Sequence, residues 1–353
     1  MGSNSANILT ITQIPVEEKM TDKLFKALVV EETDDKKYTR QILDKTIDDL
    51  PAGDVVVEVH YSSLNYKDAL SASGNKGVTR SYPHTPGIDA AGVVLESTDS
   101  AFKPKDNVIV TSYDLGMNTA GGFGQYIRVP GQWVVPMPRG LTSREAMCYG
   151  TAGFTAALSV FQLTVRGGIL PEHGEVLVSG ATGGVGGIAV AILSKLGYTV
   201  VAVNGLVDES EYLRELGAQR IISIEEATDQ SGRPLLKSLW AGSIDTVGGD
   251  LLATTIKSVN ANGVVTTCGN VASPELPINV FPFILRGVSL VGIDSQNCPM
   301  SNRLKTWEKL ADEWKIPLME TVVEEITLSD LDQAIDRMLQ GKHKGRKIVN
   351  MTA

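Results

Sequence analysis

The chain has 353 residues, of which 42% are hydrophobic and 21% charged, and its formal net charge is −9 at pH 7. This length exceeds one ordinary domain core, and the composition is typical of a globular enzyme, which excludes disordered and fibrous classes. The negative charge argues against nucleic acid as a partner, and the lack of an apolar run near the roughly 20 residues of a membrane span predicts a soluble, cytoplasmic protein without a membrane partner.

The beginning of the chain is expected to lie outside the folded domains. Residues 1–23 are polar and lack periodicity, which indicates an N-terminal extension, native or not. Short strands follow, marked by alternating apolar residues between Gly, Pro and Asp turns. They are predicted at residues 25–32, 54–66, 87–97 and 107–113. This pattern predicts a β-rich first domain that begins at residue 24.

The pattern changes at residues 144–163, which are predicted to form one long apolar helix. Strands and helices then alternate. Predicted strands cover residues 175–180, 198–204, 219–224, 243–248, 263–269 and 288–295, and predicted helices cover 186–197, 209–217 and 251–260. Repeated βα units of this kind predict an α/β fold with a doubly wound parallel sheet of the Rossmann type.

The C-terminal part of the chain loses this alternation. Two amphipathic stretches, residues 302–314 and 329–341, are predicted helices, and residues 346–351 form a last strand. A final short strand has to pair with a sheet, and we expect it to return to the first domain. The prediction is therefore a Rossmann domain at residues 148–295 inserted into a catalytic domain made of residues 24–147 and 296–353.

The strongest chemical signal is a glycine-rich turn between a predicted strand and a predicted helix. Its glycines are Gly180, Gly183, Gly184, Gly186 and Gly187. Such glycines let the backbone approach a pyrophosphate and let the helix pack on the strand, while the helix N-terminus offers amides to the anion. The spacing G-x-x-G-x-x-G departs from the strict G-x-G-x-x-G motif, but its place between a strand and a helix supports a dinucleotide site.

The tip of the second strand of the parallel sheet indicates which nicotinamide cofactor binds. A carboxylate there would bind the ribose of NAD and repel the 2′-phosphate of NADP. The sequence has Asn204, Gly205 and Leu206 at this place, and Asp208 is the nearest carboxylate. NADPH is therefore favoured over NADH, although no Arg or Lys is evident to hold the phosphate.

No metal site is expected. Cys148, Cys268 and Cys298 are widely spaced, and no sequence cluster combines histidine with cysteine. Structural roles are favoured for His60 and His84. Without zinc to polarise a carbonyl, hydride delivery to an activated C=C bond or to a quinone is favoured over alcohol oxidation, because hydrogen-bond donors can stabilise the oxyanion that forms.

Seven motifs distributed along the chain carry a family resemblance. They are SSLNYKD at 62–68, PGIDAAG at 86–92, GTAGFTA at 150–156, SGATGGVG at 179–186, DTVGG at 245–249, PFILRGVSLVGIDS at 282–295 and GKHKGR at 341–346. Together they resemble the zinc-free, quinone oxidoreductase-like branch of the medium-chain dehydrogenase/reductases, within it the acrylyl-CoA reductase group. The resemblance implies a GroES-like catalytic domain, NADPH-dependent reduction of acrylyl-CoA or a related enone, and a homodimer whose Rossmann sheets join edge to edge.

The resemblance also implies site residues. Tyr66 resembles the family's tyrosine near the nicotinamide, either as a hydroxyl donor to the oxyanion or as a lid, while Asn65 and Asp68 either bind the substrate or cap the helix that follows. The implied cofactor contacts are Tyr66, Thr151, Thr182, Gly183, Gly184, Val185, Asn204, Gly205, Leu206, Thr246 and Leu290. Leu206 departs from the family, in which a basic residue is frequent, and this weakens the NADPH assignment. Lys67 is expected to be solvated.

Two groups of basic residues have open roles. Arg80 and Arg286 are suited to the phosphates of coenzyme A, but surface or interdomain salt links are at least as good an interpretation. Lys342, Lys344 and Arg346 form a basic cluster for which solvation is favoured over a coenzyme A contact.

Three functional hypotheses follow for this small-molecule site. The leading one is an NADPH-dependent reductase that acts on the C=C bond of acrylyl-CoA or a similar thioester. The second is a quinone or general enone reductase, which uses the same hydride geometry with a looser pocket. The third is a protein that binds NADPH without catalysis.

Overall fold

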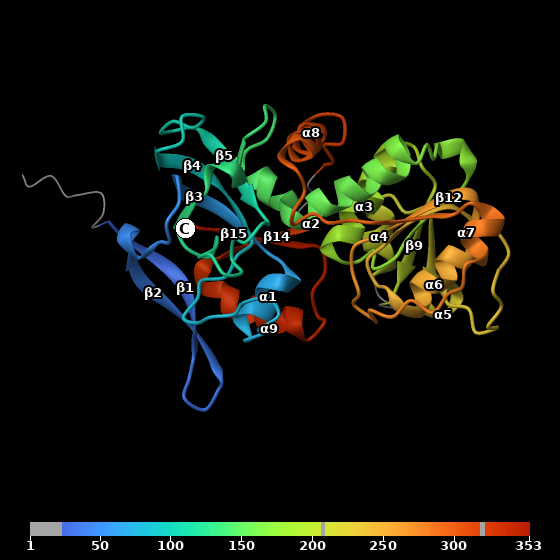
Figure 1. The fold of residues 1–353 in the computed structure, drawn as a ribbon, viewed down its shortest axis with the longest axis horizontal. Coiled ribbons are helices and arrows are strands. Elements are labelled where there is room, and N and C mark those ends of the chain that lie inside the picture. The colour runs from blue at the N-terminus through green and yellow to red at the C-terminus, as the bar shows by residue number, and fades with distance from the viewer. Residues whose placement is uncertain (1–22, 206–208, 318–321) are drawn as a thin grey trace, which may run out of the picture.

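Two large β-sheets, joined by helices, form most of the protein (Figure 1). The structure is a computed structural model that describes residues 23–205, 209–317 and 322–353. The predicted N-terminal extension, except Lys23, and the predicted cofactor contact Leu206 therefore lie outside the described residues.

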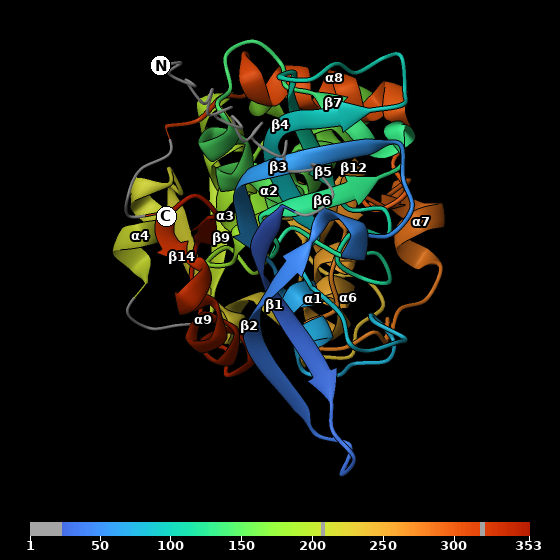
Figure 2. The same cartoon turned by 90° about the vertical axis from the view of Figure 1, so that its left-hand side faces the viewer.

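The first sheet has seven strands, six of them in the order β14-β15-β3-β4-β5-β7, with β6 also paired to β3. Its strands are β3 (Val55–Leu64), β4 (Asp89–Ser97), β5 (Asn107–Thr111), β6 (Tyr126–Val129), β7 (Val134–Pro136), β14 (Val323–Thr327) and β15 (Arg346–Asn350). A separate hairpin of β1 (Leu24–Glu32) and β2 (Tyr38–Thr46) extends from this part of the molecule, as Figure 2 shows. The β-rich first domain is thus as expected, although β2, β6, β7 and β14 were not predicted.

The C-terminal strand returns to the first sheet, as the sequence predicts. β15 runs antiparallel to β3, with Lys347 opposite Leu64 and Asn350 opposite Tyr61. In Figure 1 the last helix and strand accordingly lie among the first strands of the chain. This pairing brings Arg346 next to the SSLNYKD segment.

The second sheet has six strands, all parallel, in the order β10-β9-β8-β11-β12-β13. The strands are β8 (Val176–Val178), β9 (Val200–Asn204), β10 (Arg220–Ser223), β11 (Trp240–Asp245), β12 (Val259–Thr267) and β13 (Ser289–Gly292). The helices after them are α3 (Gly184–Lys195), α4 (Ser210–Glu215), α5 (Ile224–Ala227), α6 (Gly249–Ser258) and α7 (Phe281–Arg286). The strand order reverses between β8 and β11, and ligands of doubly wound sheets bind at such a switch point.

Helix α2 (Ser143–Phe161) joins the two sheets. One buried hydrophobic cluster contains Ala91 and Ile109 of the first sheet, Phe154 of α2 and Ile188 of α3, so the two halves share a core around this helix. The sequence predicted one continuous helix here, but Gly150 has φ 51° and ψ −157° and breaks it. The domain boundaries proposed on either side of it stay predictions.

Three further helices cover the first sheet and its junction with the second. They are α1 (Tyr66–Ala72), α8 (Met300–Ala311) and α9 (Leu331–Leu339). α9 packs on α1 although more than half of the chain separates them, which brings the C-terminal segment close to the NYKD motif (Figure 1). No helix in the described ranges is both long and apolar enough to cross a membrane.

Candidate active site

The glycine-rich turn follows β8 and is packed too tightly for side chains at two positions. Gly180 has φ +59°, and a Cβ there would lie 2.1 Å from Oγ1 of Thr246. A Cβ on Gly186 would lie 2.3 Å from the carbonyl oxygen of Gly180, so only glycine lets α3 pack on the turn. The role expected for Gly186 agrees with this geometry.

The same turn leaves room for an anion in front of α3. Gly183 is the N-cap residue of the helix, and a Cβ on it would have only one atom, the Gly180 oxygen at 3.3 Å, within 4 Å. The first-turn amides of a helix, here those of Gly184 and Val185, have no partner within the helix and point toward this space. The residues therefore fit a dinucleotide pyrophosphate, and a side chain at Gly183 would project into its place.

Hydrogen bonds tie the two strands together at the switch point. The Ser179 hydroxyl donates to Oδ1 of Asp245 at 2.7 Å, and the Thr246 amide donates to the Ser179 hydroxyl at 3.0 Å. Asp245 also accepts the amide of Gly248 at 3.0 Å. This network fixes Thr246 beside the glycine-rich turn, where a cofactor contact was expected.

The remaining predicted cofactor contacts lie on both sides of the switch point. Asn204 ends β9 and Gly205 follows it with an exposed backbone, whereas Leu290 lies half-buried on β13. The contacts predicted at Asn204 and Leu290 are thus separated by the strands of the switch point, as the two ends of a long dinucleotide require.

Asn65 and Asp68 cap helix α1. The Asn65 amide donates to Oδ2 of Asp68 at 2.8 Å, and the Ile88 amide donates to Oδ1 at 2.8 Å. Asp68 is fully buried, and its burial together with the nearby charge of Asp89 raises its pKa to about 7. Of the two roles left open for this carboxylate, its contacts are those of the helix cap.

Asp89 is the centre of the site, and the sequence analysis missed it. Its Oδ2 accepts the Ser63 hydroxyl at 2.6 Å and the Asn65 side-chain amide at 2.8 Å. Its Oδ1 accepts the Thr151 hydroxyl at 2.6 Å, and the Thr151 backbone amide donates to both oxygens. The motifs that contain Asn65, Asp89 and Thr151 therefore meet at one buried carboxylate. The only available signal was that Asp89 lies within the PGIDAAG motif.

Arg346 was predicted to belong to a solvated basic cluster, but the structure shows that it is buried. Its side chain is 3% exposed, and it donates to the Ser63 hydroxyl at 2.7 Å and to Oδ1 of Asn65 at 3.1 Å. The Asp89 carboxylate at 3.9 Å balances its charge. A guanidinium in this position cannot contact coenzyme A at the surface. Lys344, in contrast, is half-exposed and forms an ion pair with Glu209 at 2.9 Å.

Arg286 and Arg80 have different surroundings. Arg286 donates to the backbone carbonyls of Lys257, at 2.9 Å, and of Val259 and Leu236, and so ties the end of α7 to the junction of α6 and β12. This favours its structural interpretation over a phosphate contact. The side chain of Arg80 is exposed.

Tyr66 and Lys67 begin α1 and differ in exposure. Tyr66 is 56% exposed, and its hydroxyl has no hydrogen-bond partner in the described part of the chain. Lys67 is half-buried and donates to Oε1 of Gln296 at 2.7 Å, so the prediction that it is solvated was wrong. Gln296 belongs to the segment that follows β13, which brings this segment against the NYKD motif.

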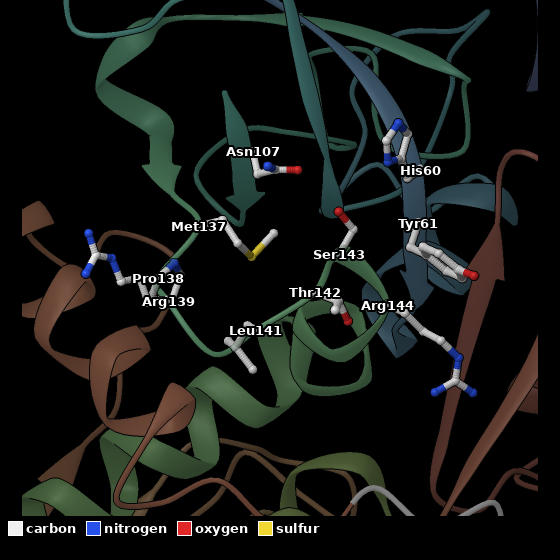
Figure 3. Close-up of a pocket in the computed structure, with 10 residues that line it drawn as sticks. All are labelled: His60, Tyr61, Asn107, Met137, Pro138, Arg139, Leu141, Thr142, Ser143 and Arg144. Carbon is white, nitrogen blue, oxygen red and sulfur yellow. The ribbon is translucent and has the colours of Figure 1, made fainter. Parts of the chain in front are cut away.

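A separate cavity of about 530 Å³ lies at the N-terminal end of α2 (Figure 3). It is lined by residues that include His60, Arg139, Ser143 and Arg144, and Arg144 is engaged by Glu325 at 2.8 Å. The Gly150 break separates this end of the helix from Thr151, so the cavity is distinct from the cofactor turn. Within residues 23–205, 209–317 and 322–353, no three His, Cys, Asp or Glu side chains are grouped to hold a metal ion.

Comparison with known proteins matches both parts of the chain. Residues 51–139 match the alcohol dehydrogenase GroES-like domain, and residues 184–313 match the zinc-binding dehydrogenase family. The acrylyl-CoA reductase AcuI of Ruegeria pomeroyi is 43% identical over 94% of this chain and 100% of its own length. The putative quinone oxidoreductase YhfP of Bacillus subtilis is 46% identical over 93% of this chain and 99% of its own length.

Solved structures match over both sheets. The yhdH oxidoreductase of Salmonella enterica in complex with NADP superposes with a TM-score of 0.89 at 44% identity and covers 92% of this chain and 99% of its own. The Bacillus subtilis yhfP with NAD bound gives 0.90 at 44% identity and covers 93% of this chain and 100% of its own. The expected fold class, a Rossmann domain inserted into a β-rich GroES-like domain, is confirmed.

Proposed function

This chain belongs to the medium-chain dehydrogenase/reductase family, and from that premise we propose that it reduces the C=C bond of an activated enone with NADPH, above all that of acrylyl-CoA. The coarser statement, a nicotinamide-dependent oxidoreductase, follows from relatives whose similarity covers almost the whole chain. The substrate, the preference for NADPH and the roles of single residues belong to the proposal.

The proposal rests on one observation: residues 345–346 connect the phosphate turn to the NYKD motif. The amide of Gly345 donates to the carbonyl oxygen of Thr182 at 3.0 Å, and the next residue, Arg346, donates to Asn65 at 3.1 Å. A single short segment thus holds the dinucleotide turn against the residue that precedes Tyr66. This arrangement supports a reaction in which the end of the cofactor lies beside Tyr66.

Each group then has a defined role. NADPH, when bound, supplies the hydride that the β-carbon of the substrate accepts. Thr182, Gly183, Gly184 and Val185 bind its pyrophosphate, and Thr246, Leu290, Asn204 and Gly205 extend the binding surface. Thr151, held by Asp89, lines the nicotinamide end. The Tyr66 hydroxyl donates a hydrogen bond to the carbonyl oxygen, which becomes more basic as charge develops on it.

The decisive experiment measures NADPH and NADH oxidation with acrylyl-CoA and, separately, with a simple quinone. We expect acrylyl-CoA to be reduced with NADPH, and dialysis against EDTA to leave the rate unchanged because the proposal involves no zinc. Failure to reduce the thioester while the quinone is reduced would support the second candidate, which the 46% identity to a putative quinone oxidoreductase favours. Tight NADPH binding without turnover on either acceptor would indicate a binding protein.

A homodimer joined through the Rossmann sheets is also part of the proposal. β13 is an outer strand of the parallel sheet, and the adjoining segment exposes apolar side chains. Val280 is 60% exposed, Ile284 66% and Leu285 63%. Apolar groups gathered beside an edge strand are typical of a protein interface. Light scattering should give twice the mass of the chain, and Ile284→Glu combined with Leu285→Glu should give one chain mass.

A further inference from the structure

We propose that Lys67 is the acid that protonates the substrate, an inference that rests on the proposed reduction of an enone. In this step the β-carbon accepts a hydride, the C=C electrons move to form an enolate, and the α-carbon then takes a proton from the Lys67 ammonium. The enolate electrons form the new C–H bond, Lys67 is left neutral, and solvent restores its proton. The saturated thioester and NADP are the products.

Two chains of contacts start at Thr151 and meet at Lys67. The first runs through the Ser112 hydroxyl, 3.0 Å from that of Thr151, to Tyr113, whose amide donates to the Gln296 carbonyl oxygen at 3.2 Å. Oε1 of the Gln296 side chain then accepts a hydrogen bond from the Lys67 ammonium at 2.7 Å.

The second chain of contacts runs through Asp89 and Asn65. The side-chain amide of Asn65 donates to Oδ2 of Asp89 at 2.8 Å and to Oδ2 of Asp68 at 3.2 Å. Asp68 directly follows Lys67 in the sequence. The two chains therefore close at α1, and Tyr66 lies between Asn65 and Lys67. Lys67 and Tyr66, the residue proposed to bind the carbonyl oxygen, are therefore neighbours in the first turn of α1.

The ammonium has no ion pair among the described residues, although two carboxylates are near. The oxygens of Asp68 accept the amides of Asn65 and Ile88, and those of Asp294 accept both amides of Asn297 at 3.0 Å. An ammonium has three N–H donors, and Gln296 takes one of them. A half-buried ammonium with no direct ion pair keeps donors available to a substrate, and such groups are found at functional sites.

The partner of Lys67 is itself held rigidly. The carbonyl oxygen of Gln296 accepts Arg303 at 3.2 Å as well as Tyr113, and Arg303 is fully buried with its guanidinium 4.4 Å from the Tyr113 ring centre. Ser112 and Tyr113 both have positive φ, 65° and 50°, a strained conformation for residues other than glycine. Strained segments that the surrounding structure holds in place are found at sites that need fixed geometry.

Titration of Lys67 provides a readout that a structural role would not give. Burial lowers the pKa of Lys67, and the charges of Asp68 on α1 and Asp294 after β13 oppose this effect. Because the acid form is required, the rate should fall as pH rises through this pKa. Gln296→Glu puts a carboxylate against the ammonium, so it should raise the pKa and move the alkaline decline to higher pH.

The experiment compares Lys67→Met, Lys67→Arg and Lys67→Gln with the wild type on acrylyl-CoA and on a simple enone. Arginine keeps the charge but does not release a proton. We expect all three variants to lower kcat by about 10²- to 10⁴-fold, the usual contribution of a general acid, with NADPH affinity unchanged within threefold. Lys103→Met, at an exposed turn between β4 and β5, is the control and should keep its rate.

The results that would overturn proton donation by Lys67 differ from the result that would overturn the proposed function. Activity retained by Lys67→Arg but lost by Lys67→Met would show that the charge matters and would overturn proton donation. Activity retained by all three variants, or an alkaline decline that Gln296→Glu does not move, would also overturn it. A wild type that reduces neither the thioester nor the enone contradicts the proposed function itself, and the inference then fails with it. The melting temperature of each variant identifies any that is misfolded, and the correctly folded variants decide the result.

Discussion

The hydroxyl of Thr151 donates to Oδ1 of Asp89 at 2.6 Å, and the backbone amide of Thr151 donates to both carboxylate oxygens. Gly150 breaks helix α2 immediately before this contact, so Thr151 starts a new helical segment whose N-terminus faces a carboxylate. Anions stabilise helix N-termini by accepting unpaired amides and by opposing the helix dipole. The contact therefore ties strand β4 of the first sheet to the half of α2 that leads into the second.

Asp89→Asn should destabilise the protein. The change removes the charge that balances the buried Arg346, and an amide nitrogen would face donors in place of an acceptor. Breaking a buried charge pair in this way costs about 3–5 kcal/mol. Urea unfolding monitored by circular dichroism should show this loss, while Asp34→Asn, at an exposed turn, should change stability by less than about 0.5 kcal/mol. Equal stabilities of the two variants would contradict the role given to Asp89.

Gly150→Ala tests the close approach at the helix break. A Cβ there would lie 2.5 Å from Oδ2 of Asp89 and 2.5 Å from the Ser63 hydroxyl, in addition to the strain of φ +51°. Gly168 has φ +68° and nothing within 4 Å of its Cβ position, so Gly168→Ala carries backbone strain alone. Strain of this kind costs about 1–3 kcal/mol, and we expect the Gly150 variant to lose clearly more stability in the same unfolding assay. If the two losses are alike, the Asp89 contact does not limit this position.

The break at Gly150 also shows why the sequence predicted one helix. The apolar pattern of residues 144–163 continues through the glycine because both halves of α2 bury a face in the same core. The break lies against Asp89, which is far away in the sequence and is brought there by β4. Arg346 was misjudged for the same reason, since its partners Ser63 and Asn65 lie on the other side of the inserted domain. A local pattern does not contain such partners.

The parts that were predicted correctly have local signals. The glycine-rich turn, the strands of the parallel sheet and the return of the last strand follow from composition, periodicity and the need of a strand to pair. β2 was missed because none of its side chains is buried, which leaves no apolar face to detect. β14 is a short strand of five residues with two glutamates. Lys67 was misjudged because the segment that covers it, residues 294–298, comes from the far end of the Rossmann sheet.

Gly183→Val should abolish cofactor binding without unfolding the protein. The new side chain would project into the open space in front of α3, where the pyrophosphate is proposed to bind. A ligand at about 100 times its Kd stabilises a protein by about 2.7 kcal/mol, so NADPH should raise the melting temperature of the wild type but not that of the variant. The two proteins should melt alike without cofactor. A variant with an unchanged NADPH Kd would place the pyrophosphate elsewhere.

His343 should lower stability as pH falls below 6.5, whereas Asp68, whose pKa is raised to about 7, contributes with the opposite sign over the same window. Burial, with the charges of Arg346 and Lys347, lowers the pKa of His343 from 6.5 to about 4. Between these values the unfolded chain binds a proton that the folded chain does not, so stability is lost as pH falls from 6.5 to 4. The loss is about 2–3 kcal/mol for a shift of this size. His343→Gln should remove this component, so the unfolding free energy of the variant should fall less, or rise more, than that of the wild type as pH falls from 6.5 to 4. An identical pH dependence in the two proteins would contradict the role given to His343.

Tyr66→Phe and Tyr66→Ala separate the two roles proposed for this residue. Removal of a hydrogen-bond donor to a developing oxyanion lowers kcat by about 10²- to 10³-fold, and Tyr66→Phe removes only the hydroxyl. If Tyr66 is a donor, both variants should lose this much activity on acrylyl-CoA with little change in KM. If it is a lid, the phenyl ring should keep the rate and only Tyr66→Ala should lose it. We expect the first result, because the hydroxyl has no partner within the described residues and is therefore available to a substrate.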